Sequence, residues 1–429
     1  MTGVTQRPGL GAMRIGYLMQ NGAPDLSTLS GPQLHVTAVV RGLQKRGHVV
    51  RTVASQRGRL QWSDDLSQWH PVHFTFSSSR RFRALERPLR RLQREAQLPF
   101  IGIFDSARYA DAASYHLRGF DVVYERHGHM GYGGILAARR LGIPAVIELN
   151  GNILKELDAQ GIPMSRLQRA VSRQVTVSTF RAADHVVAVS QALGDELVMR
   201  LGVPARRVSV VENGVDIELF RRPVDAAQVR QRYRLGGGPL VCFVGSFQAW
   251  HGVELLVRAF GSVREQHPEA RLVLIGDGVG RPAVGAQVST MRLADKVDFL
   301  GCLPQAEVAG VVRSSDVLVA PYPVPQDDFI GTPLKLLEYM AAGKAIVASR
   351  ARTHDLIEDG VTGLRVPPAN AGALAAGIVR LLGDPALRAA LGAAAARAAT
   401  AHSWDRVVDE LCTVLTTVIE FYRGSAAGS

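Results

Sequence analysis

The chain has 429 residues, of which 47% are hydrophobic and 21% charged, as is ordinary for a soluble globular protein of two or three domains. Its formal charge of +12 favours anionic partners such as nucleotides, phosphates, nucleic acid or a membrane surface, although a GC-rich genome would also enrich arginine, alanine and glycine. The three cysteines lack metal-ligand spacing and a disulfide framework, and no segment has the apolar length of a signal peptide core or a membrane span. We therefore expect a cytoplasmic protein with reduced thiols.

Strands and helices alternate along the first half of the chain. A strand at 14–19 precedes a helix that ends near Gly47, and Ser30 with Gln33 predicts a capping box at the start of that helix. Further strands are predicted at 48–54, 121–125, 144–149, 185–190 and 208–214, and helices at 134–141, 166–182 and 191–201. This alternation predicts a doubly wound parallel sheet.

The same pattern restarts after the glycine-rich break at 236–238. Strands are predicted at 239–246, 270–278, 296–301, 316–322, 345–348 and 363–367, and an amphipathic helix covers 403–422. Open parallel sheets bind ligands beyond the carboxyl ends of their strands. We therefore expect two α/β domains with a ligand cleft between these two edges.

One predicted helix carries charged residues in an otherwise apolar sequence. Thr332 suits the N-cap and Pro333 the first helical position, so Lys335 falls in the first turn, where a cation opposes the helix dipole. A lysine at a helix N-terminus indicates a phosphate site, and the alternative is a solvated lysine. Glu338, one turn later, either accepts both hydroxyls of a ribose or pairs with Lys335 on the surface.

Glycines and polar residues follow several of the predicted strands. Gly31 is either a backbone donor at an anion site or an ordinary turn glycine. Ser246 and His251 either donate to phosphate or have structural roles. In the first half, His127, His129 and Asn150 follow strands that end in Glu125 and Glu148, and structural hydrogen bonding is the alternative for each.

Several quoted segments occur in the order seen in GT-B-fold glycosyltransferases of family 4, among them RAADHVVAVSQALGDEL, VGSFQAWHGVELLVRAF and PLKLLEYMAAGKAIVAS. The sequence resembles this family from about residue 12 to residue 425. The resemblance implies an acceptor-side Rossmann-like domain at 1–218, a nucleotide-sugar-binding one at 219–405, and a terminal helix at 406–429 that packs back on the first domain.

The resemblance also implies the chemistry. Such enzymes transfer a sugar from a nucleoside-diphosphate sugar to an acceptor hydroxyl with retention, and without a catalytic metal or cofactor. A UDP-sugar such as UDP-GlcNAc is favoured here, with a GDP-sugar as the alternative donor. Rival interpretations are a GT-B-fold sugar-nucleotide epimerase and a non-catalytic sugar-nucleotide-binding protein. A dehydrogenase is disfavoured because no G-x-G-x-x-G follows the first strand, and we expect no nucleic-acid partner.

Residue roles follow from matching positions. Ser246 and His251 stand where many relatives carry arginine and lysine, Ile330 where many carry a glutamate, and Asn150 where a histidine often contacts the sugar. With these departures from the family pattern, we predict a catalytic set of Lys335, His251, Ser246, Asn150 and His127. The expected donor contacts are Gly31, Gly245, Ser246, Gly276, Gly278, Leu300, Gly331, Thr332, Pro333, Leu334, Lys335 and Glu338. The expected acceptor contacts are Glu125, His127, His129 and Asn150.

The acceptor itself is left open between a small metabolite such as an aminocyclitol and a lipid-linked or polysaccharide intermediate. Residues 80–94 place Phe82, Leu85, Leu89 and Leu92 on one stripe among arginines, interrupted by Pro88. This pattern is typical of a helix on a membrane surface or of a solvated helix. We expect a bacterial monomer or homodimer, with peripheral contact at the inner membrane face if the acceptor is a lipid.

Overall fold

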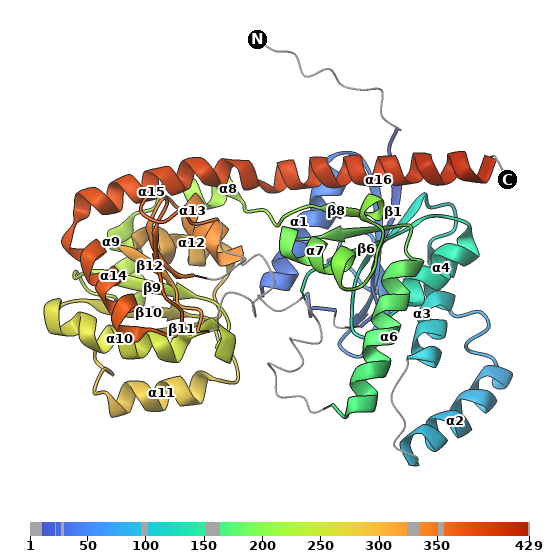
Figure 1. The fold of residues 1–429 in the computed structure, drawn as a ribbon, viewed down its shortest axis with the longest axis horizontal. Coiled ribbons are helices and arrows are strands. Elements are labelled where there is room, and N and C mark those ends of the chain that lie inside the picture. Colours follow the sequence, from blue (N-terminus) through green and yellow to red (C-terminus); the bar gives the residue numbers. More distant parts are fainter. Residues whose placement is uncertain are drawn as a thin grey trace, which may run out of the picture. The chain divides into compact units, whose positions relative to one another are not determined.

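The computed structural model describes residues 11–21, 23–26, 30–95, 102–151, 164–323, 334–350 and 356–427. Contacts divide the chain into two units (Figure 1). Unit 1 comprises Met1–Glu212 with Val407–Ser429, and unit 2 comprises Asn213–Arg406. The sequence suggested boundaries after residues 218 and 405, a few residues away.

Unit 1 is built on an eight-stranded sheet with the order β4-β3-β2-β1-β5-β6-β7-β8. Six strands are parallel, and the apolar runs of all but the edge strand β8 are largely buried because helices cover both faces. Their bounds are β1 Arg14–Met19, β2 Val49–Gln56, β5 Val122–Arg126, β6 Ala145–Leu149, β7 His185–Ala188 and β8 Val208–Val210. The sequence did not predict the antiparallel edge strands β3 (Arg59–Ser63) and β4 (His70–Pro71), which are short and polar.

The helices of unit 1 in the described residues are α1 Gly31–Lys45, α2 Arg80–Glu95, α3 Ile103–His116, α4 Gly133–Leu141, α6 Arg166–Ala182 and α7 Gln191–Met199. Ser30 caps α1 by accepting from the Gln33 amide N–H at 3.3 Å. The capping box predicted there is half formed, because the Gln33 side chain donates instead to Thr37 Oγ1 at 3.1 Å. A complete capping box occurs at the start of α6, between Ser165 and Gln168.

The terminal helix α16 (Trp404–Ala427) joins unit 1 from Val407 onward. It lies against α1 so closely that a Cβ on Gly42 would be 2.6 Å from Val408 Cγ2. Arg423 pairs with Asp121 at 2.6 Å, just before β5 begins. The helix therefore covers the amino-terminal edge of the unit 1 sheet, and the prediction that the tail packs back on the first domain is confirmed.

Unit 2 contains a fully parallel six-stranded sheet with the order β11-β10-β9-β12-β13-β14. Its strands are β9 Leu240–Val244, β10 Arg271–Ile275, β11 Val297–Gly301, β12 Val317–Ala320, β13 Ala345–Ser349 and β14 Leu364–Val366. Its helices in the described residues are α8 Ile217–Arg221, α9 Ala226–Tyr233, α10 Val253–Gln266, α11 Arg281–Thr290, α12 Gln305–Ser314, α13 Leu334–Ala341, α14 Ala371–Gly383 and α15 Pro385–Ala399.

Two apolar clusters fill the two faces of this second sheet. The strand order reverses between β9 and β12 in unit 2 and between β1 and β5 in unit 1. Ligands of doubly wound folds bind at such switch points, beyond the carboxyl ends of the strands. The prediction of two Rossmann-like parallel-sheet units is confirmed. No helix in the described part of the chain is long and apolar enough to cross a bilayer.

Candidate functional site

The loops that follow β9, β10 and β11 are joined by main-chain hydrogen bonds. The Gly245 N–H donates to Ile275 O at 2.9 Å, and the Gly276 N–H donates to Gly301 O at 2.7 Å. The Phe247 N–H then donates to Asp277 O at 2.9 Å. These bonds unite the three loops into one ledge of backbone at the carboxyl edge of the unit 2 sheet.

Gly276 is required in this ledge by its conformation and by its neighbour. Its φ is +123°, and a Cβ there would lie 2.0 Å from Gly245 O. We expect Gly276→Ala to lower the free energy of unfolding by about 3 kcal/mol or more, because backbone strain and a clash with main chain add. Urea denaturation measures this loss.

Gly301→Ala is the matched control for Gly276→Ala. Gly301 also has a positive φ, +67°, but a Cβ there would meet no atom within 4 Å. The control therefore measures only the cost of placing an alanine at a positive φ, about 1–2 kcal/mol. Equal losses in the two variants would show that the close approach of the two loops does not matter.

Lys335 lies buried beside this ledge, near the start of α13. Only 8% of the residue is exposed, and its Nζ is 4.3 Å from the centre of the Phe243 ring and 5.5 Å from that of Tyr322. Nζ has no hydrogen-bond partner among the described residues. Burial lowers the pKa of Lys335 to about 7, against a smaller raising effect of Glu338. The alternative of a solvated lysine is therefore wrong.

His251 and Ser246 face each other across the loop after β9. His251 Nδ1 is 2.6 Å from the Ser246 carbonyl oxygen and 3.1 Å from Ser246 Oγ. Because a carbonyl only accepts, Nδ1 carries the proton, and in the neutral ring Nε2 is an acceptor. Burial and the charge of Lys335 lower the pKa of His251 to about 3. The ring is therefore neutral in this state.

Glu338 lies one turn after Lys335 and is also buried. Gln305 Nε2 donates to its Oε1 at 3.2 Å. Burial raises the pKa of Glu338 to about 7, while the Gln305 hydrogen bond and the Lys335 charge act in the opposite direction. The pairing of Glu338 with Lys335 as an exposed surface pair is thus excluded, and the carboxyl group is held in the same region as the lysine.

Of the other residues predicted to contact the donor, some lie in the described residues and some lie outside them. Gly331, Thr332 and Pro333 lie outside the described residues, and Leu334 is the first residue described in α13. Gly278, with φ +152°, approaches the Phe247 main chain, and Leu300 is half-buried on β11. Gly31 is the first residue of α1 in unit 1.

At the carboxyl edge of the unit 1 sheet, Glu148 is the centre of a buried hydrogen-bond network. Its Oε1 lies 2.9 Å from His35 Nε2 and accepts from Tyr124 Oη at 2.6 Å. Its Oε2 accepts from Asn150 Nδ2 at 2.8 Å, and Arg126 Nη1 lies 3.6 Å away. Burial alone would raise the pKa of Glu148, but His35, Arg126 and the Tyr124 hydrogen bond lower it to about 2.

Glu125 is the next-to-last residue of the neighbouring strand β5, and its carboxyl group is in the opposite charge state to that of Glu148. It is 2% exposed, and a Cβ on Gly134 would lie 2.2 Å from its Oε2, so it sits directly beneath the start of α4. Burial raises the pKa of Glu125 to about 8, against a Gly134 N–H bond. Glu125 is therefore protonated at neutral pH, and it is not among the residues that line the cavity of unit 1.

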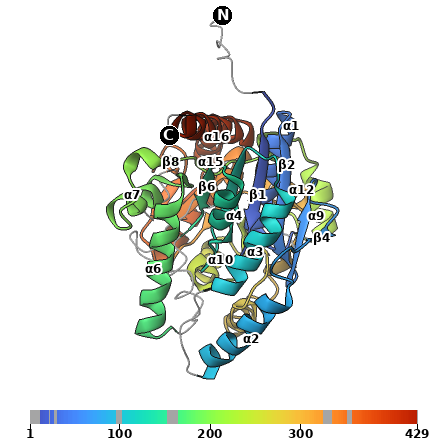
Figure 2. The same cartoon turned by 90° about the vertical axis from the view of Figure 1, so that its right-hand side faces the viewer.

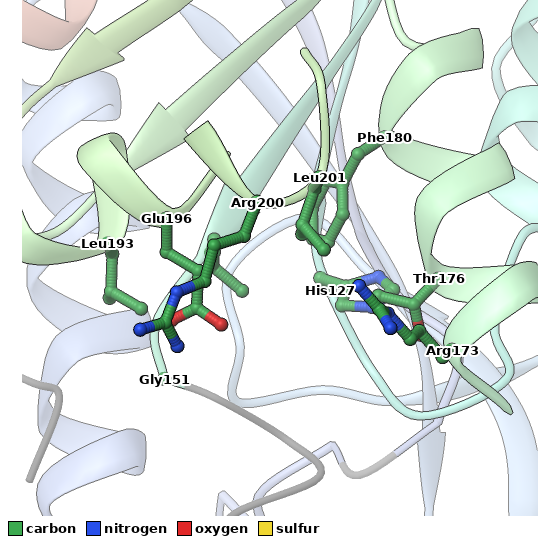
Figure 3. Close-up of a pocket in the computed structure, with 10 residues that line it drawn as sticks. His127, Gly151, Arg173, Thr176, Phe180, Leu193, Glu196, Arg200 and Leu201 are labelled. Atoms are coloured by element: carbon green, nitrogen blue, oxygen red, sulfur yellow. The ribbon is translucent and has the colours of Figure 1, made fainter. Parts of the chain in front are cut away.

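That cavity, of about 330 Å³, lies between α6, α7 and the ends of β5 and β6 (Figure 3). Of the predicted acceptor contacts, His127 lines it, and its ring packs against that of Phe180 at 4.6 Å between centres, with the two planes tilted by 52°. Burial lowers the pKa of His127 to about 4, so this ring is neutral. His129 is turned to α6, with Nε2 2.7 Å from Ser172 Oγ.

Two arginines that the sequence analysis did not single out also line the cavity. Figure 3 shows Arg173 of α6 near His127, and Arg200 at the end of α7 near Glu196. Arg173 and Arg200 are exposed. Their positions in the sequence look like those of solvated helix arginines. The sequence did offer one indication that they lie close together. Arg173 lies on the helix before β7, and Arg200 lies at the end of the helix after it.

Among the described residues, no three His, Cys, Asp or Glu side chains gather closely enough to hold a metal ion.

Family models match both halves of the chain. One described as glycosyl transferases group 1 matches residues 238–384, and one described as glycosyltransferase family 4 matches residues 29–219. The D-inositol 3-phosphate glycosyltransferase of Thermobispora bispora is 30% identical over 321 residues, which cover 72% of this chain and 73% of that protein.

Solved structures of the same fold are more distant in sequence. The sucrose-phosphate synthase of Thermosynechococcus elongatus superposes with a TM-score of 0.71 at 19% identity, covering 97% of this chain and 100% of that one. HepE of Anabaena, solved in complex with UDP, gives a TM-score of 0.68 at 19% identity over 94% of this chain and 100% of that one. The chain therefore belongs to the group 1 glycosyltransferases of the GT-B fold.

Proposed function

We propose that unit 2 binds the diphosphate of a UDP-sugar and that the enzyme transfers the sugar with retention of anomeric configuration. The observation that carries the proposal is Lys335, a buried ammonium without a hydrogen-bond partner in the described residues, beside a ledge of glycine backbone. A buried cation is costly unless an anion joins it. A diphosphate supplies that anion, and the UDP complex of HepE supports uracil as the base.

The difficult step of this reaction is departure of the nucleoside diphosphate from the anomeric carbon. Negative charge grows on the bridging oxygen, so a fixed cation stabilises the transition state more than the ground state. Lys335 supplies that cation, and Glu338 accepts from the ribose hydroxyls. Retention needs no separate base, because in same-face attack the leaving phosphate takes the proton of the acceptor. No metal is needed for this step as we propose it.

His251 has a different role from that of Lys335. In its neutral state Nε2 can only accept, so His251 donates to phosphate only after it gains a proton. The charge of Lys335 opposes that proton, and a bound diphosphate favours it. We infer that Lys335 provides the main charge and that His251 and Ser246 complete the site once the donor is present. The Gly31 amide and Asn150 remain predicted contacts.

The cavity in unit 1 is proposed as the acceptor site. Its two arginines favour an acceptor that carries an anionic group, and its Phe180 and Leu193 supply an apolar wall. The relative named D-inositol 3-phosphate glycosyltransferase supports a phosphorylated cyclitol among the small metabolites. A lipid-linked or polysaccharide acceptor is the alternative.

The donor proposal is tested with a thermal-shift panel of UDP-, GDP- and ADP-sugars, followed by assays for free nucleotide. A specific donor raises the melting temperature by mass action. Release of UDP only when an acceptor is added supports transfer. A donor that is isomerised without UDP release indicates an epimerase, and binding without any turnover indicates a sensor. A GDP-sugar preference would overturn the assignment of the base.

The acceptor site is tested with Arg173→Gln and Arg200→Gln. If the arginines contact an anionic group, each change raises the acceptor KM by about tenfold or more, since a charged hydrogen bond contributes about 1.5–3 kcal/mol. The donor KM stays unchanged. Arg166→Gln is the matched control, because this arginine is exposed on the same helix but does not line the cavity. Equal effects of Arg166→Gln and Arg173→Gln would contradict the assignment.

A further inference from the structure

Helix α2 exposes its leucines to the outside of unit 1. Leu85, Leu89 and Leu92 are 59%, 42% and 55% exposed. The sequence predicted one stripe that included Phe82 and was interrupted at Pro88. The helix is instead continuous from Arg80 to Glu95 with Pro88 inside it, and Phe82 is turned inward to pack on Phe104 at 5.8 Å between ring centres. The three leucines therefore form a separate outer strip.

Ion pairs with α3 fix this orientation. Glu86 is 7% exposed and accepts from Arg108 Nη2 at 2.5 Å and from Arg90 Nε at 2.9 Å. Arg90 also donates to Asp105 at 2.6 Å. Figure 2 shows α2 at the periphery of unit 1, next to α3. The helix thus buries its acidic centre and exposes its apolar strip, the reverse of an ordinary surface helix.

Other exposed apolar side chains lie in the segments just before α2 and at the start of α3, and exposed arginines lie elsewhere around α2. Twelve large apolar side chains are exposed in the described residues, and five of them belong to this region: Phe76, Leu85, Leu89, Leu92 and Ile103. Such clustering marks an interaction surface, because single exposed apolar residues are normally scattered. Five exposed arginines lie on the same helix, namely Arg80, Arg81, Arg83, Arg87 and Arg91.

We propose that this face of α2, with Leu85, Leu89 and Leu92 at its centre, docks on an anionic lipid surface. Leucines enter the acyl boundary, while guanidinium groups on long stems bind headgroup phosphates. Charge complementarity favours an anionic lipid surface over a second copy of the chain, because α2 carries seven arginines and two glutamates and a second, equally basic α2 would repel it. The inference goes beyond the proposed reaction and does not rest on it.

Co-sedimentation with vesicles tests the proposal on the full chain. One set contains phosphatidylcholine alone and the other about 30% phosphatidylglycerol. We expect binding to the anionic vesicles, weakened by salt, and little binding to the neutral ones. The triple change Leu85→Glu, Leu89→Glu and Leu92→Glu, and the quadruple change of Arg80, Arg81, Arg83 and Arg87 to Gln, each weaken binding at least tenfold.

Phe421→Glu with Val361→Glu is the matched control, since both side chains are exposed far along the chain from α2. This variant binds the anionic vesicles like the wild type. Circular dichroism melting verifies that every variant folds. No binding of the wild type to anionic vesicles, or unchanged binding of both α2 variants, overturns the proposal. A lipid-free dimer that the leucine variant dissociates assigns the face to a second copy and also overturns it.

Discussion

Lys335→Met is expected to lower kcat by about 10²–10³-fold and at the same time to stabilise the empty enzyme. The loss of rate follows because one preorganised donor to a developing oxyanion contributes about 3 kcal/mol. The gain in stability follows because methionine keeps the packing on Phe243 and Tyr322, while a buried ammonium that has no hydrogen-bond partner among the described residues is removed. Steady-state kinetics at saturating donor and urea denaturation without ligand measure the two effects.

We also expect the stability of Lys335→Met to depend on pH differently from that of the wild type. The folded-state pKa of Lys335 is about 7, below its ordinary value of 10.5. Between these values the unfolded chain binds the extra proton, so the free energy of unfolding of the wild type rises with pH. The full stability of the wild type is present above pH 10.5, where Lys335 is neutral in both the folded and the unfolded chain. The part that depends on a neutral Lys335 is lost as the pH falls to 7. The variant lacks this rise.

Lys344→Met is the matched control for the lysine. Lys344 lies just before β13 and is half-buried, and burial lowers its pKa also. It has Asp316 as a neighbouring charge, and no role in the donor site is proposed for it. We expect near-wild-type kcat from this variant. A wild-type kcat for Lys335→Met at saturating donor would remove the lysine from the mechanism.

The sheets could be predicted from the sequence because their strands are short apolar runs between turn residues, as in Leu240–Val244 and Ala345–Ser349. The hairpin of β3 and β4 was missed because Arg59–Ser63 is polar and only partly buried, so no apolar run marks it. The orientation of α2 was missed for a related reason. Periodicity places leucines on one stripe, but the buried Glu86 decides which side of the helix faces α3.

The site was predictable where one residue breaks a local rule and unpredictable where distant residues meet. Lys335 could be found because a cation in the first turn of an apolar helix is unfavourable. The contact between His35 and Glu148 joins residues 113 positions apart, and no local sequence pattern around either residue predicts it. Glu125 and Glu148 end adjacent strands in similar sequences, yet their pKa values shift in opposite directions. Only the surrounding partners distinguish them.

These two glutamates give a paired prediction. We expect Glu148→Gln to lower the free energy of unfolding at pH 7 by about 3–5 kcal/mol, the cost of breaking a buried ionic network. The new amide N–H₂ group would face the Asn150 amide group or Tyr124, where donors already point at the carboxylate. Glu125→Gln changes little, within about 1 kcal/mol, because Glu125 is already neutral at that pH and glutamine has nearly its shape.

Acid titration of stability separates the two residues further. The folded-state pKa of Glu148 is about 2, below its ordinary 4.5, so its contribution is present above pH 4.5 and is lost as pH falls to 2. Glu125, with a raised pKa of about 8, contributes below pH 4.5 and loses that contribution as pH rises to 8. Urea denaturation at a series of pH values measures both. Equal losses of unfolding free energy from Glu125→Gln and Glu148→Gln at pH 7 would refute the opposite charge states. A neutral glutamine removes a charge from an ionised Glu148 but removes none from a protonated Glu125, so the two replacements must have unequal effects.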